Sequence, residues 1–277
     1  QAYKRSDGKL MLIAGDRKAA VYGIDADSGK QLWKDKPEAH PWAMNTGSAA
    51  FHDGTVYVPF ASFEELAGGS PTYECCTFRG SVNAYELETG KRLWKTYLIP
   101  EPAKKTVKAG NGTQLWGPSG VAVWSQPTID AKAGAIYLTT GDSYSAPAAD
   151  TSDSIVALDL KTGAIRWHKQ MTADDAFTAA CVAHNADPIA RKGCGPDIDF
   201  GSSAILRTLP NGKRVLLAGQ KSGVMHAIDP DAQGAVLWQK RLSPGGVLGG
   251  IEWGYAADDS HVYVPISDVW ESRSEPG

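Results

Sequence analysis

The fold is decided by a segment that recurs four times along the chain. It reads V-Y-G-I-D-A-D-S-G-K-Q-L-W at residues 21–33, returns at 82–94 and 155–167, and recurs with one extra residue at 225–238. In these copies apolar and polar residues alternate as in a half-buried strand, and the central Asp and Gly favour a tight turn. Each copy is therefore predicted to form a β-hairpin that ends in a tryptophan.

The repeat predicts an all-β fold, a β-propeller of four-stranded antiparallel blades. A further strand pattern precedes each hairpin and one follows the last, at residues 9–14, 55–60, 135–140, 214–219 and 261–266. The tryptophan at one fixed place per repeat suggests a docking ring, in which each indole packs on the neighbouring blade. The tryptophans are 61, 73 and 71 residues apart, more than the roughly 40–50 of a simple blade. Long loops should therefore gather on one face, where function is usually found.

Composition excludes some classes of protein. The 277 residues are 42% hydrophobic and 21% charged, with a net charge of -3. Because there is no basic excess, a nucleic-acid partner is not expected. There is no apolar run of about 18 residues, so no membrane span is expected. A repeat architecture alone leaves open a propeller that serves only as an interaction platform.

The segments between the repeats resemble those of the PQQ-dependent alcohol dehydrogenases (PQQ, pyrroloquinoline quinone), in particular the polyvinyl alcohol dehydrogenase branch. The resemblance implies one propeller domain over residues 1–277 and the oxidation of secondary alcohols or polyvinyl alcohol with PQQ and Ca²⁺. The alternative is a scaffold of the same superfamily, such as an outer-membrane assembly factor. The segments that carry the resemblance are YECCTFRGSV at 73–82, GPSGVAVWS at 117–125, GPDIDFG at 195–201, AGQKSG at 218–223 and LGGIEWG at 248–254.

The cysteines are predicted to form two disulfides. The resemblance implies that Cys75 and Cys76 bridge each other and cover one face of the quinone, although this pair lies where the family has a glutamate metal ligand. The alternative is two buried free thiols. Cys181 and Cys194 bracket a 12-residue insertion, and a disulfide between them would hold the loop before the candidate base.

The resemblance also implies a tryptophan that lies against the quinone, a metal site and a catalytic base. Trp124 lies 18 residues before Asp142, the interval between the family's tryptophan under the quinone and an asparagine metal ligand. A carboxylate at Asp142 is still a hard oxygen ligand for Ca²⁺. Asp197 corresponds to the catalytic base that takes the alcohol proton, and it is also a metal candidate. Asp199 lies on the same face if the segment is extended, so the two carboxylates could share the roles of base and ligand.

Further candidates surround the quinone. Lys221 and Arg79 are the cations that would meet its carboxylates, and Thr46 offers a hydroxyl. Trp253 lies beside Glu252 where the family has an Asn-Trp pair, so the glutamate puts that contact in doubt. Glu74, directly before the cysteine pair, is a candidate metal ligand. Each of these has a plain alternative, a tryptophan in the core or a charge in a solvated turn.

The chain is also expected to be part of a longer protein. Four hairpins and one further strand pattern amount to about five of the eight blades of the dehydrogenases that it resembles. An open arc of blades would expose apolar faces, so the isolated piece should be poorly soluble or inactive. The even number of cysteines favours a periplasmic or secreted protein, with a small or polymeric alcohol as substrate and a cytochrome c as electron acceptor.

Overall fold

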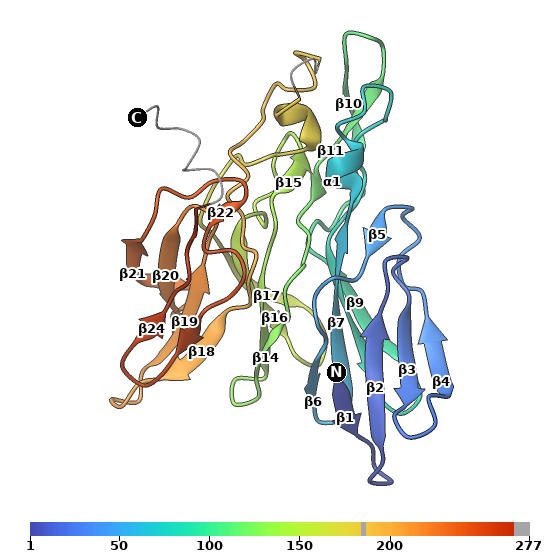
Figure 1. The fold of residues 1–277 in the computed structure, drawn as a ribbon, viewed down its shortest axis with the longest axis vertical. Coiled ribbons are helices and arrows are strands. Elements are labelled where there is room, and N and C mark those ends of the chain that lie inside the picture. The colour runs from blue at the N-terminus through green and yellow to red at the C-terminus, as the bar shows by residue number, and fades with distance from the viewer. Residues whose placement is uncertain (184–186, 269–277) are drawn as a thin grey trace.

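The computed structural model describes residues 1–183 and 187–268, and these residues form four antiparallel sheets side by side (Figure 1). The antiparallel sheets predicted from the repeat are confirmed: three have four strands, and the second has a fifth, short strand. Among these residues no helix is both long and apolar enough to cross a membrane.

Each sheet ends in one of the predicted hairpins. The first sheet contains β1 (Ala2–Lys4), β2 (Leu10–Gly15), β3 (Val21–Asp25) and β4 (Gln31–Asp35). The second contains β5 (Ala43–Met44), β6 (Ala50–His52), β7 (Thr55–Ser62), β8 (Ser81–Glu86) and β9 (Arg92–Tyr97). The third contains β13 (Thr128–Asp130), β14 (Ala135–Thr139), β16 (Ser154–Asp159) and β17 (Ile165–Gln170). The fourth contains β18 (Ile205–Thr208), β19 (Arg214–Gly219), β20 (Val224–Asp229) and β21 (Ala235–Arg241).

The hairpin turns have the chemistry that the sequence predicts. In the first hairpin the Asp25 side chain accepts a hydrogen bond from the Ser28 backbone N–H at 2.8 Å, and Asp159 does the same for Thr162 at 2.9 Å. The glycine that follows has a positive φ, 71° at Gly29 and 74° at Gly163. Glycine is favoured there because it adopts this backbone conformation without a steric penalty.

The tryptophans dock on the next sheet, as predicted. The Trp33 indole N–H donates to the Leu87 carbonyl oxygen at 2.8 Å, across the boundary between the first and second sheets. A Cβ at Gly90, in the second hairpin turn, would lie 2.4 Å from the Trp33 ring. Trp94 and Trp167 meet the third and fourth hairpins in the same way, at Gly163 and Gly234. Only a glycine leaves room for the indole at these positions.

The core lies between neighbouring sheets. Four buried apolar clusters fill the boundaries, and residues such as Tyr85, Leu138 and Leu216 are almost fully buried. The fourth cluster joins the last sheet to a short pair, β23 (Ala256–Ala257) with β24 (Val262–Tyr263). The strand predicted at 261–266 is therefore present only as the two residues of β24.

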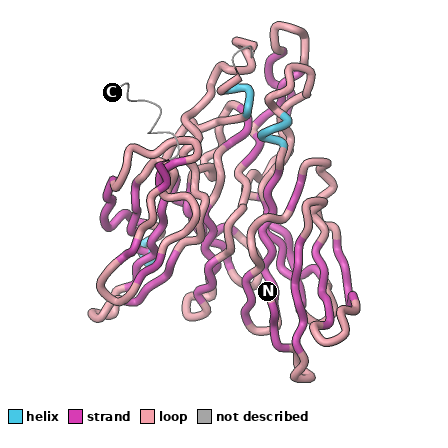
Figure 2. The backbone as a smooth tube through the Cα atoms, viewed as in Figure 1, coloured by secondary structure: helices cyan, strands magenta, loops and turns pink. Residues whose placement is uncertain are grey.

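Irregular elements gather at one end of the sheets, where Figure 2 shows most of the long loops. They position the site described below. They comprise α1 (Glu64–Ala67), η1 (Ala179–Cys181), the hairpin of β10 (Lys104–Lys108) with β11 (Gln114–Gly117), the pair of β12 (Ser119–Gly120) with β15 (Ser143–Ser145), and the pair of β22 (Gly249–Gly250) with β25 (Ser267–Asp268). One further turn, η2 (Pro230–Ala232), lies in the last hairpin.

The sheets form an open arc within the described residues. No strand pairing there joins the first sheet to the last, and the two lie at opposite sides of Figure 1. Apolar side chains are exposed at both ends, as predicted: Leu10 is 47% exposed on β2, and Trp238 is 44% exposed on β21. Trp33, by contrast, is 8% exposed. Trp238 thus has the docking position without a docked hairpin among these residues.

Candidate active site

Three buried aspartates form the centre of the candidate site. Carboxylate oxygens of Asp142, Asp197 and Asp199 all lie within 4.8 Å of one another. Asp142 follows β14, whereas Asp197 and Asp199 lie in the connection that leads into β18. Residues from two neighbouring sheets therefore converge, as the spacing predicts.

Lys221 neutralises part of this charge. Its Nζ lies 2.8 Å from Asp197 Oδ1 and 2.9 Å from Asp199 Oδ1. Lys221 follows β19, and its backbone N–H donates to the Asp199 carbonyl oxygen at 3.0 Å, which ties the two loops together. One ammonium pairs with two of the three carboxylates, so ionisation of all three would leave an excess of buried negative charge.

Burial and mutual repulsion set the protonation of the group. Burial, followed by the neighbouring Asp199, raises the pKa of Asp197 to about 8, although Lys221 opposes this shift. Burial lowers the pKa of Lys221, but the charges of Asp199 and Asp197 outweigh it and the pKa is raised overall. Lys221 is therefore a cation at neutral pH, and Asp197 can hold or release a proton near that pH.

Trp124 covers the cluster. Its indole N–H donates to Asp199 Oδ2 at 3.2 Å, and Lys221 Nζ lies 5.5 Å from its ring centroid. Trp253 meets Trp124 edge-on, with ring centroids 6.2 Å apart, and is 74% exposed. Both indoles and Thr46 line a cavity of about 400 Å³ beside the aspartates, here called the axial cavity. The sequence predicts that Thr46, Arg79, Trp124, Asp197 and Lys221 converge: Trp124, Asp197 and Lys221 do so here, Thr46 shares a cavity with Trp124, and Arg79 lies elsewhere.

Two predicted site residues lie elsewhere. The Arg79 guanidinium donates to the carbonyl oxygens of Ile99 and Pro100 at 3.1 and 2.6 Å and stacks on the Tyr97 ring. It is held by the chain that leaves β9 and does not reach the cluster. Glu74 is exposed and accepts the Trp116 indole N–H at 3.3 Å. It is not among the carboxylates that cluster in the described part of the chain, so the structure gives its expected place at the metal site no support.

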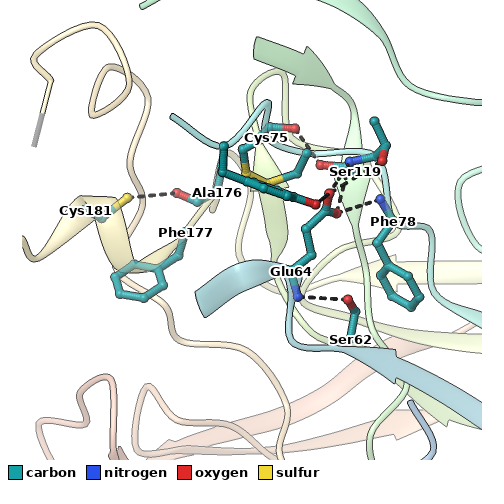
Figure 3. The surroundings of a disulfide bond; sticks show 12 residues. Ser62, Glu64, Cys75, Phe78, Ser119, Ala176, Phe177 and Cys181 are labelled. Atoms are coloured by element: carbon teal, nitrogen blue, oxygen red, sulfur yellow. Dashed lines mark hydrogen bonds between the residues drawn. A yellow bond between two sulfur atoms is a disulfide. The ribbon is translucent and has the colours of Figure 1, made fainter. Parts of the chain in front are cut away.

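Both predicted disulfides are present, Cys75–Cys76 and Cys181–Cys194. Figure 3 shows Cys75 near the buried Glu64, whose carboxylate accepts the Phe78 backbone N–H at 2.7 Å. Cys75 lines a different cavity from the one that contains Trp124. That the disulfide covers one face of the quinone stays a prediction.

Four further acidic residues surround the cluster, and three of them, Asp175, Asp153 and Glu65, were not predicted from the sequence; Glu252 was named there only for its place beside Trp253. Asp175 accepts the backbone N–H groups of Asp197 and Ile198 at 3.1 and 3.0 Å, and so supports Asp197 in a left-handed conformation with φ 53°. Asp153 is fully buried, and both its carboxylate oxygens lack a hydrogen-bond partner among the described residues. Burial raises the pKa values of both Glu65 and Glu252, and the charges of Asp199 and Lys221 shift these values up and down, respectively. None lies in a repeat, so no spacing pointed to them.

A divalent cation fits these residues. Asp142, Asp197 and Asp199 supply hard oxygen donors from two loops, of the kind that Ca²⁺ prefers. Burial and the neighbouring Glu65 raise the pKa of Asp142 well above its usual range, because so many carboxylates share one dry space. A bound cation would offset that repulsion. The residues here that suit a quinone are Trp124, through its indole, and one cation, Lys221.

Comparison with known families agrees with this chemistry. The model described as "Glucose/ethanol/alcohol dehydrogenase, beta-propeller domain" matches residues 67–180, and that of "Outer membrane protein assembly factor BamB" matches residues 4–114. Polyvinyl alcohol dehydrogenases of Sphingopyxis and of a Pseudomonas species are 41% and 44% identical to this chain over 97% and 91% of its length. The chain is therefore similar to these alcohol dehydrogenases. It spans 42% and 39% of the length of these two relatives.

Solved structures confirm the propeller fold. The quinohemoprotein alcohol dehydrogenase ADHIIG of Pseudomonas putida matches 86% of the chain with a TM-score of 0.61 and 24% identity, over 33% of that structure. BamB of Moraxella catarrhalis matches 96% of the chain with a TM-score of 0.52 and 16% identity, over 54% of that structure. At this identity both matches concern the fold alone.

Proposed function

We propose that this chain forms part of a PQQ- and Ca²⁺-dependent alcohol dehydrogenase that oxidises secondary alcohols, polyvinyl alcohol among them. The observation that carries the proposal is the buried cluster of Asp142, Asp197 and Asp199 with Lys221, in contact with the Trp124 indole. A scaffold that only presents surfaces does not need three buried carboxylates in one place, since burying charge is costly unless it serves a ligand.

In this proposal each residue has a role. Asp142 and Asp199 hold the cation, and Asp197, kept close to the cluster by Lys221 and Asp175, is the base that takes the hydroxyl proton of the substrate. PQQ, when bound, supplies the acceptor for the two electrons of the alcohol. Trp124 offers the flat apolar surface, Lys221 the charge for its oxygens, and Thr46 and Trp253 the rim of the axial cavity.

The cell compartment and the electron acceptor follow from the same proposal. Two disulfides and the absence of free thiols favour an oxidising compartment, so the protein is proposed to be periplasmic or secreted. A quinone reduced by an alcohol must be reoxidised, and a cytochrome c is the proposed acceptor.

The test is Asp197→Asn in the full-length protein loaded with PQQ and Ca²⁺. Removing a general base should lower kcat/KM for 2-propanol by roughly 10²–10⁴-fold, measured with a dye as electron acceptor. Asp150→Asn is the matched control, because the Asp150 side chain is 82% exposed and lies away from the cluster. Wild-type activity in Asp197→Asn, with an unchanged melting curve, would refute the assignment.

A further inference from the structure

A second cavity lies beside the Cys75–Cys76 disulfide and has no part in the chemistry described so far. It measures about 420 Å³ and is here called the outer cavity. Its walls include the β10–β11 hairpin and residues 187–192 of the loop that follows η1, both outside the four sheets. The residues used below are Val107, Thr113, Trp116, Tyr144, Thr178 and Ile189, all of which line it.

We propose that the outer cavity binds a stretch of a neutral polymer in which methylene and secondary carbinol groups alternate, as in polyvinyl alcohol. This inference rests on the proposed alcohol oxidation, and it assigns the part of the protein that recognises the polymer rather than the reacting alcohol. The occupant is inferred from the lining, the charges and the position of the cavity.

The lining matches an amphipathic neutral chain. Val107, Trp116 and Ile189 supply apolar surface, while Thr113 and Thr178 carry hydroxyl groups among them. Binding sites of about 300–1,000 Å³ usually combine such apolar walls with a few polar groups. A small alcohol alone would fill little of 420 Å³.

The charged residues of the lining do not call for a charged ligand. The Asp187 carboxylate already accepts the backbone N–H groups of Gly110 and Ile189, each at 2.8 Å. Lys192 is exposed, so its ammonium can remain in water. A ligand that carries neither charge is therefore favoured over a sugar acid or a peptide with charged side chains.

The outer cavity shares a wall with the aspartate cluster. Tyr144 lines the outer cavity and lies two residues after Asp142 on the same segment. Thr178 follows Phe177, whose backbone N–H donates to Asp142 Oδ2 at 3.1 Å. A polymer held in the outer cavity would thus be anchored next to the site that oxidises its carbinol groups, and the resulting gain in local concentration favours long substrates.

The test measures polymer binding and small-alcohol turnover separately in the full-length protein loaded with PQQ and Ca²⁺. Val107→Glu and Ile189→Glu place a charge in the apolar wall at residues that are 56% and 41% exposed, so folding should survive. Calorimetric titration with a short polyvinyl alcohol oligomer should show affinity reduced about tenfold or more. The kcat/KM for 2-propanol should stay within about twofold of wild type.

A matched control lies on the same loop. Val182 is 63% exposed and is absent from the lining, so Val182→Glu should leave oligomer affinity unchanged. Unchanged oligomer affinity in both wall variants, with 2-propanol still oxidised, would overturn the cavity assignment and leave the alcohol chemistry intact. If wild type oxidises no alcohol but binds the oligomer through this wall, the proposed function fails and the binding site stands.

Discussion

His226 shows how burial fixes the charge of one side chain. It lies in β20, is 2% exposed, and hydrogen-bonds Gln220 Oε1 at 3.2 Å and Gln239 Nε2 at 2.9 Å. These partners suit a neutral imidazole, and burial lowers its pKa to about 4. The unfolded chain takes up the proton near pH 6.5, whereas the folded chain does so only near pH 4.

We therefore predict that stability falls as the pH drops from 6.5 to 4, by up to about 3 kcal/mol from this residue. Stability from His226 is fully present above pH 6.5, because both states are then neutral. Urea unfolding at pH 7 and pH 5 should show that the free energy of unfolding falls less in His226→Gln than in wild type. In the control His168→Gln, at an exposed position on β17, stability should fall as much as in wild type. An equal fall in stability in all three proteins would contradict the prediction.

Spacing in the sequence located some site residues and misplaced others. Trp124, Asp142 and Lys221 lie within a few residues of a repeat strand, so the regular architecture fixes where they end up. Asp197 lies eight residues before β18 and was located by that interval. The direction of Arg79 depends instead on the irregular chain around Ile99 and Pro100, which accept its hydrogen bonds. Asp175 and Glu65 could not be predicted, because they lie in long loops whose paths follow no repeat.

At the scale of elements, the docking of each hairpin on the preceding tryptophan is the recurrent contact. Gly90 and Gly54 both have positive φ, 70° and 71°. A Cβ at Gly90 would lie 2.4 Å from the Trp33 ring, whereas a Cβ at Gly54 would have nothing within 4 Å. A substitution by alanine would thus strain the backbone equally at both glycines. Only at Gly90 would the new Cβ also meet the docked tryptophan.

We predict that Gly90→Ala destabilises the protein by about 1–3 kcal/mol more than Gly54→Ala, which is the usual range for overpacking a well-packed contact. The comparison is made by urea unfolding of the two variants and wild type. The same free energy of unfolding for both variants would show that Trp33 docking contributes little.

The hairpins could be predicted from sequence because each carries its own strand alternation and turn residues. The strand pairs at the site end could not, because β12 and β15 have only two and three residues and pair across a long stretch of chain. The last predicted strand was too long for a related reason, since alternation at 261–266 does not reveal whether a partner is present along its whole length.

At the scale of the whole molecule, the arc of sheets brings loops from neighbouring blades to one end, and this convergence makes the site. Asp142 from the third sheet and Lys221 from the fourth meet only because the tryptophans hold those sheets in register. The relatives are more than twice as long as this chain. Further blades of the full-length protein are therefore expected to contribute to the far side of the axial cavity.

The most direct test of the account is a titration of the full-length apoprotein with PQQ, with and without Ca²⁺, followed by quenching of tryptophan fluorescence and by difference absorbance. We predict saturable binding that requires Ca²⁺, is weakened at least about tenfold by Trp124→Ala or Asp142→Ala, and is unchanged by Asp150→Asn. Absence of PQQ binding by the folded full-length protein, or binding unaffected by Trp124→Ala and Asp142→Ala, would contradict the central claim that these residues form a quinone site.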